Sequence, residues 1–342
     1  MPSRRIAFLD CAKVLTAFLV VFVHCYDTYN ALCVHIKAFH MPLFFVISGM
    51  LFHVPEQPFR RWLLRQVRTL LVPALISMVL FVLLAIPAYR LGIGDVFREL
   101  QLTSDHSSMD MLLAYLQKTC HGFLHSVYVP NGLVWFLFAL FSCRLFLYVT
   151  LRKPWLGLSI LAVLIVAALT LRHRLPLFLP QALMSFPFFV GGYLLRDKLK
   201  SIDNARFLPA KALACLATTI VLTHFNGEVS SYTLSFGQRA WWLSAPMFYV
   251  NACVGTLMIL YLSAMLRSVV NWAKLGTALL TILLYQFFFV NCIGNLWLRF
   301  NPPIYIALIE SVFVMLLCYA LDWLLSRYAP WVLGLRTLDV RH

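Results

Sequence analysis

The sequence predicts an all-α fold, a polytopic helix bundle embedded in a membrane. Of the 342 residues, 62% are hydrophobic and only 12% are charged, and the mean hydropathy is +0.83. Soluble domains carry about 25% charged residues, so this chain falls outside their range. The apolar residues also gather in about ten runs, each close to the length that crosses about 30 Å of hydrocarbon. We therefore expect about ten transmembrane helices.

The expected helices follow one another along residues 1–342 as a single membrane domain, with no appended soluble domain. The apolar runs lie near residues 8–26, 38–53, 68–88, 132–150, 155–171, 180–195, 209–225, 243–266, 276–296 and 303–326. The runs near 38–53, 180–195 and 209–225 are short or interrupted, so tilted, broken or partly re-entrant helices are open there. Asp10 and Lys13 interrupt the first run and no small-residue cleavage site follows it, which favours a retained helix over a signal peptide.

The longest connection, at about 89–131, separates the third and fourth runs and is expected on the outer side. It contains the amphipathic stretch MDMLLAYLQKTCHGFLH, which predicts an interfacial helix near 109–124. Long loops are often functional, so this segment either borders a substrate entrance or is a linker.

The net charge of +15 would suit a nucleic-acid-binding protein, but its placement indicates membrane topology. With the N-terminus inside, about 18 basic residues fall in cytoplasmic segments and about 8 outside. Both termini are then cytoplasmic. The basic clusters are expected to contact anionic membrane lipids, a ligand-binding role being the alternative, and no nucleic-acid partner is expected.

Two ionisable residues in the first run are the main evidence for a functional site. Lys13 and His24 are eleven residues apart, which places them on nearly one face of a helix and about 16 Å apart along it. An ionisable group inside a bilayer costs several kcal/mol unless it is paired or faces water. These two residues are therefore functional candidates, and a structural pair of Lys13 with Asp10 is the simpler alternative.

Several motifs in the chain resemble those of acyltransferase family 3. The resemblance begins with Asp10, Lys13 in the family's basic position and His24, and continues with His40-Met41-Pro42-Leu43-Phe44-Phe45 leading to Ser48-Gly49. Weaker matches are the basic stretch Arg60 to Arg68 running into Leu71-Val72-Pro73, then Leu133-Val134-Trp135-Phe136-Leu137, and Phe188 to Tyr193. The chain is most similar to the membrane sugar O-acetyltransferase branch, which is fucose 4-O-acetylase-like. It departs at Gln286, where the family often has a histidine.

The resemblance implies transfer of an acetyl group from cytoplasmic acetyl-CoA to a sugar hydroxyl on the far side of the membrane. The acceptor would be an exported or envelope polysaccharide, or its lipid-linked precursor. No permanently bound cofactor is implied, because acetyl-CoA is the acyl donor. We expect a multi-pass protein of a bacterial inner (plasma) membrane.

The two histidines are the candidates for acid–base chemistry. Acyl transfer to an alcohol needs a base, and histidine titrates near neutral pH, so His24 is the expected general base. His40 precedes Pro42, a residue favoured in the first turn of a helix, so we expect it at the positive end of a helix dipole. There it would donate to an oxyanion or orient the sugar, or simply bind a backbone carbonyl. An acyl-histidine intermediate and direct attack are both open.

The donor is expected to contact basic residues. Lys13 would hold the thioester carbonyl or a phosphate, with Asp10 beside it, and Arg60, Arg61 and Arg65 would bind phosphates at the cytoplasmic mouth. Ordinary positive-inside anchoring is the alternative for these arginines.

Other polar and aromatic residues carry weaker predictions. Ser48 either packs with Gly49 or donates its hydroxyl to the substrate, with packing favoured. Trp135 either stacks on carbohydrate or, as we favour, belongs to an aromatic belt. His121 and His125 have a metal-binding spacing but lack further ligands, so no metal site is expected.

The alternative function is a proton-coupled transporter or glycan exporter, because about ten helices with buried charge also describe such carriers. A glycan-binding receptor or a catalytically inactive relative is a further alternative. Transporters commonly show repeated halves, whereas the ionisable residues here concentrate in the first two runs.

Overall fold

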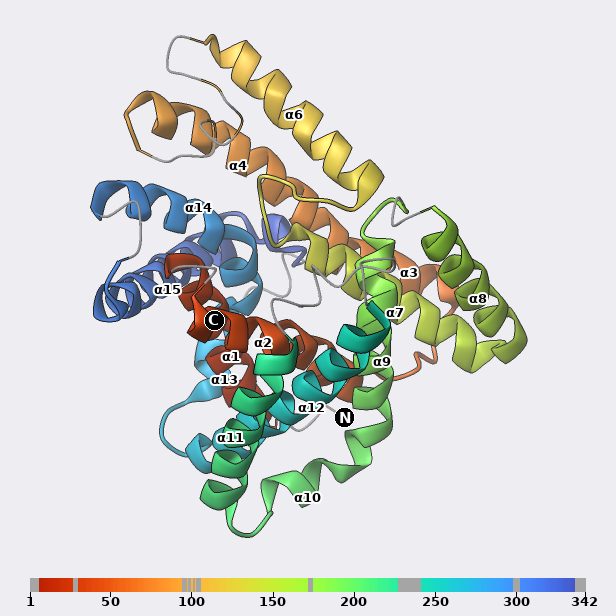
Figure 1. The fold of residues 1–342 in the computed structure, drawn as a ribbon. Helices are drawn as coiled ribbons and strands as arrows, with labels where there is room; N and C mark the ends of the chain where they lie inside the picture. Colours follow the sequence, from red (N-terminus) through yellow and green to blue (C-terminus); the bar gives the residue numbers. More distant parts are fainter. Residues whose placement is uncertain are drawn as a thin grey trace.

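The computed structural model describes residues 6–26, 30–93, 106–171, 175–226, 241–297 and 302–335, together with Phe97, Leu100 and Leu102. Over this part of the chain every regular element is a helix, which confirms the all-α membrane bundle (Figure 1). The two termini predicted to be cytoplasmic, 1–5 and 336–342, lie outside the described residues, as do several positions of the long connection at 94–105.

Each of the ten predicted apolar runs lies on a helix. In chain order the elements are α1 Ala7–Cys25, α2 Ala31–Met50, α3 Phe59–Gln66, η1 Val67–Leu71, α4 Val72–Arg90, α6 Ser108–His125, α7 Val134–Arg152, α8 Pro154–Thr170, α9 Leu179–Leu195, η2 Arg196–Lys198, α10 Leu199–Asp203, α11 Leu208–Asn226, α12 Trp241–Leu266, α13 Trp272–Leu275, η3 Gly276–Ala278, α14 Leu279–Trp297, α15 Ile304–Tyr328 and η4 Pro330–Leu333.

Eight helical segments of the described chain are long and apolar enough to cross a membrane. They are Ala7–Cys25, Ala31–Met50, Phe59–Arg90, Val134–Arg152, Leu208–Phe225, Pro246–Leu266, Trp272–Ile293 and Ile304–Tyr328. Helices α8 and α9 are shorter, at 17 residues each, and rise about 26 Å. Together these ten segments account for the predicted runs.

Helices α1 and α2 lie at the centre of the bundle (Figure 1). Helix α1 packs against α2, α12, α14 and α15, while α2 also packs against α9. The contact between α2 and α9 depends on glycine. A Cβ on Gly49 would lie 1.9 Å from the Phe189 carbonyl oxygen, and one on Gly192 would lie 2.0 Å from the Val46 carbonyl oxygen. This confirms the packing role expected at Gly49.

The second helix begins earlier than the sequence predicted. We expected it near residue 38, with His40 close to its start, but α2 begins at Ala31, where the Asn30 side chain accepts a hydrogen bond from the Leu32 N–H at 3.0 Å. His35 and Lys37 lower the hydropathy of the first two turns, which hid them from the apolar pattern. Pro42 is therefore inside the helix, and His40 lies in its middle.

A π-helical turn, η1, joins α3 to α4. Pro73 has no N–H to donate, and at this point the Val72 N–H bonds the carbonyl of Val67, five residues earlier. The turn determines which way Gln66 points at the end of α3, and Gln66 is buried. Such turns occur frequently at functional sites.

The helix predicted near 109–124 is present as α6, which lies along the outside of α4 (Figure 1). Tyr115 holds it there by donating a hydrogen bond to the Met78 carbonyl at 3.0 Å. At its start Ser107 and Asp110 form a capping box, and these hydrogen bonds lower the pKa of the Asp110 carboxyl. Exposed apolar side chains line its free face, namely Met109, Leu113, Leu116 and Leu124.

Candidate functional site

A cavity of about 260 Å³ lies at the end of the bundle where α1 begins and α2 ends, which is the predicted cytoplasmic end. Its walls come from α1, α2, α7, η3 and α14. Its charged and hydroxyl-bearing lining residues are Lys13, Ser48 and Arg144, and the other lining positions are apolar or glycine. A mainly apolar cavity with a few convergent polar groups is typical of a ligand site.

Lys13 both forms an ion pair and lines this cavity. Its Nζ lies 3.0 Å from Oδ1 of Asp10, one turn earlier in α1, so the predicted pairing is present. The Lys13 side chain is 21% exposed and that of Asp10 is 15% exposed. The second carboxylate oxygen of Asp10 is buried and accepts no hydrogen bond from the residues that the structure describes. The pair thus presents its cationic member to the cavity.

Ser48 faces the cavity from α2, whereas the neighbouring Gly49 packs against α9. Gly49 therefore has the packing role, and Ser48 is the residue that faces the space for a substrate. The Ser48 hydroxyl is the group available to a ligand.

Arg144 also lines the cavity, although it was not among the predicted site residues. It lies in the middle of α7, and its Nη1 donates a hydrogen bond to Oε1 of Gln66 at 2.7 Å. Its Nε is buried, and no described residue forms a hydrogen bond with it. An arginine within an apolar run was the available signal, because it is as costly there as Lys13 in the first run.

The arginines expected at the cytoplasmic mouth are on α3 and η1. Arg60, Arg61 and Arg65 are exposed on α3. Arg65 lies close enough to Arg144 for the two charges to interact. Arg68 is half-buried, and its Nε donates to the Gly334 carbonyl at 3.1 Å, which ties the chain beyond η4 to the π-helical turn.

His24 lies in the last turn of α1, at the opposite end from Lys13. Its ring is half-buried and meets the ring of Phe287, on α14, edge to face at a centroid distance of 5.5 Å. It forms no hydrogen bond with another described residue.

His40 is buried, with 7% of its surface exposed, and its Nδ1 lies 2.9 Å from the Ile36 carbonyl oxygen. A carbonyl only accepts hydrogen bonds, so Nδ1 must carry a proton, and in the neutral ring Nε2 is then an acceptor. The predicted place at the start of a helix is wrong, because α2 extends nine residues before His40. Nε2 of neutral His40 is therefore able to accept a hydrogen bond from a hydroxyl but not to donate one to an oxyanion.

The structure brings the two histidines together and separates them from the cavity. His24 and His40 lie within electrostatic range of each other and of Lys37. Along α1, Lys13 is about 16 Å from His24 by helical rise. One small ligand cannot contact the Lys13 amine and the His24 ring with the same atom.

Two further residues lie in the interior. Trp135 is 4% exposed in the first turn of α7, so the aromatic-belt interpretation that we favoured for it is wrong, because a belt residue faces lipid. Gln286 is fully buried beside Phe287, and within the described part of the chain neither the oxygen nor the nitrogen of its side-chain amide has a hydrogen-bond partner.

On α6, the rings of His121 and His125 lie 4.5 Å apart between centroids. The described residues contain no group of three or more side chains able to hold a metal ion.

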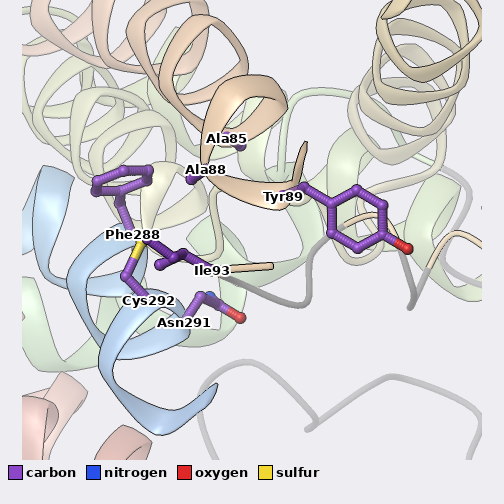
Figure 2. Close-up of a pocket in the computed structure, with 7 residues that line it drawn as sticks. All are labelled: Ala85, Ala88, Tyr89, Ile93, Phe288, Asn291 and Cys292. Carbon is purple, nitrogen blue, oxygen red and sulfur yellow. The ribbon is translucent and has the colours of Figure 1, made fainter. Parts of the chain in front are cut away.

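A second, much smaller space lies between α4 and α14, lined by Ala85, Ala88, Tyr89, Ile93, Phe288, Asn291 and Cys292 (Figure 2). Its volume is about 10 Å³, which is near the size of one water molecule. The Tyr89 ring points away from Phe288, and its hydroxyl donates to the Leu102 carbonyl at 2.7 Å. This space includes none of the candidate residues.

Comparison with protein families gives one finding. The family model described as the acyltransferase domain, Acyl_transf_3, matches residues 6–323, nearly the whole chain. Neither the curated proteins nor the solved structures give a match. The matched region contains α1 and α2 with Lys13, His24 and His40, and also the cavity. The chain therefore belongs to acyltransferase family 3, and it is a multi-pass membrane acyltransferase.

Proposed function

We propose that this protein transfers an acetyl group from cytoplasmic acetyl-CoA to a hydroxyl of an envelope or exported polysaccharide. The observation that carries the proposal is the arrangement of α1 and α2. A cavity containing Lys13 and Ser48 lies at one end of this helix pair, and His24 and His40 lie toward the other. This arrangement suits a donor that enters from one side of a membrane and an acceptor on the other.

In the proposed reaction the sugar hydroxyl attacks the carbonyl carbon of the thioester. His24 takes the hydroxyl proton as the new C–O bond forms, and the C–S bond breaks when the tetrahedral intermediate collapses. The histidinium then returns the proton to the coenzyme A thiolate. The products are an acetyl ester and the free thiol, so atoms and charges balance.

The proposed roles of the two histidines differ. His24 has no hydrogen bond to a described residue and is the general base. His40, whose Nδ1–H is held by the Ile36 carbonyl, presents Nε2 to a hydroxyl and orients the acceptor. We assign Trp135, buried at the start of α7, to the wall of the acceptor site.

The proposed role of Lys13 follows from its distance to His24. Because about 16 Å separate the two residues along α1, Lys13 cannot stabilise an oxyanion formed beside His24. Lys13 and Ser48 instead contact the pantetheine arm of the donor, and Arg60, Arg61 and Arg65 bind its phosphates.

Reconstitution of the full chain with labelled acetyl-CoA and candidate glycans tests this function. General-base catalysis contributes about 10²–10⁴-fold, so His24→Ala should lower the transfer rate by that order. His121→Ala, which removes an exposed histidine from α6, is the matched control and should transfer label at the wild-type rate. Unchanged transfer by His24→Ala would remove His24 as the base, and the absence of transfer by the wild-type protein to any glycan would refute the proposed function.

A further inference from the structure

Arg144 is a half-buried cation that pairs with no carboxylate among the described residues. An arginine within a membrane-spanning helix is normally paired, because an isolated charge there is costly. The ion pairs among the described residues do not include Arg144 or Arg65. Arg144 instead bonds a neutral group, the side-chain amide of Gln66, at 2.7 Å. Its positive charge is therefore positioned by the protein without being neutralised.

The position of Gln66 depends on the π-helical turn. Gln66 is the last residue of α3, immediately before η1, and it is buried against α7. The bond to Gln66 uses Nη1 of Arg144 and leaves Nε buried, with no hydrogen-bond partner among the described residues. Arg144 also lines the cavity, so its side chain is bonded to Gln66 on one side and borders the cavity on the other.

On the side of the cavity near α3, two positive charges lack a paired negative charge among the described residues. Asp10 neutralises Lys13 at 3.0 Å, but Arg144 and Arg65 lie within electrostatic range of each other, and no carboxylate of a described residue is paired to either. Two guanidinium groups from different helices repel each other unless an anion lies between them. Guanidinium binds phosphate oxygens with two parallel hydrogen bonds, which makes phosphate the matching anion.

We infer that Arg144, positioned by Gln66, forms with Arg65 a phosphate-binding site at the cavity, and that this site holds the nucleotide end of the acyl donor. The inference rests on the proposed function for the identity of the donor. It assigns Arg144 to ligand binding and gives Gln66 a positioning role. The pantetheine arm then extends from this site past Lys13 toward the histidines.

The test compares coenzyme A with pantetheine, which lacks the nucleotide and its phosphates, as ligands of the full chain in phosphatidylcholine nanodiscs. Loss of a charge-assisted contact should weaken coenzyme A binding by Arg144→Gln about 10- to 100-fold and leave pantetheine binding unchanged. Arg65→Gln, at an exposed position, should show the same selective loss. Because the proposed function already gives Arg65 a phosphate contact, Arg144→Lys keeps the test valid if Arg144→Gln fails to fold: it keeps the charge but not the two parallel hydrogen bonds, so it should weaken coenzyme A binding and leave pantetheine binding unchanged. Arg327→Gln, which removes an arginine on α15, is the matched control and should bind both ligands as the wild type does.

Gln66→Glu tests the positioning role, because it keeps the acceptor oxygen but neutralises the guanidinium. It should lower coenzyme A affinity and reduce its dependence on salt, whereas Gln66→Asn, with a shorter side chain, should lower the affinity and keep the salt dependence. Equal losses for coenzyme A and pantetheine, or no loss in either arginine variant, would overturn the inference.

A lipid phosphate is the other source of the same chemistry. If phosphatidylglycerol in the nanodisc displaces coenzyme A from the wild type, the site belongs to a lipid headgroup and the inference is overturned. If the wild type binds no coenzyme A at all, the donor of the proposed function is wrong, which is a different result from wild-type binding that survives Arg144→Gln.

Discussion

Lys13 combines two roles that sequence reasoning treated as alternatives. It is the partner of Asp10 and also a cavity-lining cation. If pairing were its only role, removing either partner would have similar consequences. If the amine also contacts the donor, then the two substitutions differ in their effect on activity.

Lys13→Met should lower acetyl transfer about 10- to 100-fold, the effect of losing a contact to a charged group. Asp10→Asn keeps an acceptor oxygen for Lys13 and should retain most of the activity. The measurements are the transfer rate and the thermal unfolding midpoint of each purified variant. Equal losses of activity in both variants would show that the pair is only structural.

At single positions, prediction from sequence worked where a residue was chemically out of place. Lys13 and His24 stood out because ionisable groups are rare in apolar runs, and the same argument applied to Arg144 would have found it. Gln66 was not predictable, because its role depends on the direction set by a π-helical turn. The hydrogen bond from His40 to Ile36 depended on a helix start that the apolar pattern placed too late.

Between elements, the close approach of α2 and α9 depends on two glycines whose missing Cβ atoms would overlap backbone. Gly49 would meet Phe189 and Gly192 would meet Val46, and main-chain atoms cannot turn aside as a side chain can. The apolar pattern predicted both helices, but it contains no information on which helices touch.

Gly192→Ala should therefore force α2 and α9 apart and destabilise the protein by about 1–3 kcal/mol, the usual cost of overpacking. Gly191→Ala is the matched control on the same helix, because no atom lies within 4 Å of its added Cβ. It should be neutral or slightly stabilising, since alanine favours the helix by up to about 1 kcal/mol. Thermal unfolding in detergent compares the two, and equal midpoints for both variants would contradict the close-packed contact.

For the whole molecule, the composition and the lengths of the apolar runs were enough to predict the fold class, because a bilayer admits few other architectures for such a chain. The orientation of the bundle rests on the distribution of basic residues. That distribution predicts that both chain ends and the mouth of the cavity are cytoplasmic and that α6 lies outside.

The native cysteines offer a direct measurement of this orientation. Cys120 is exposed on α6, outside the membrane-spanning segments. A membrane-impermeant thiol reagent should therefore label intact spheroplasts of cells that make the protein, and Cys120→Ser should lower that labelling. Labelling of the wild type only after the membrane is opened would mean that the bundle has the reverse orientation.

The π-helical turn at Val67–Leu71 also sets the angle by which α3 is rotated about the helix axis relative to α4. It holds one residue more per turn than an α-helix, and each residue corresponds to a rotation of about 100°. Deleting a single residue there would straighten the segment but rotate α3 relative to α4 by roughly a quarter of a circle or more. Gln66 would then leave Arg144, and the exposed arginines would face a different neighbour, although every helix would still form.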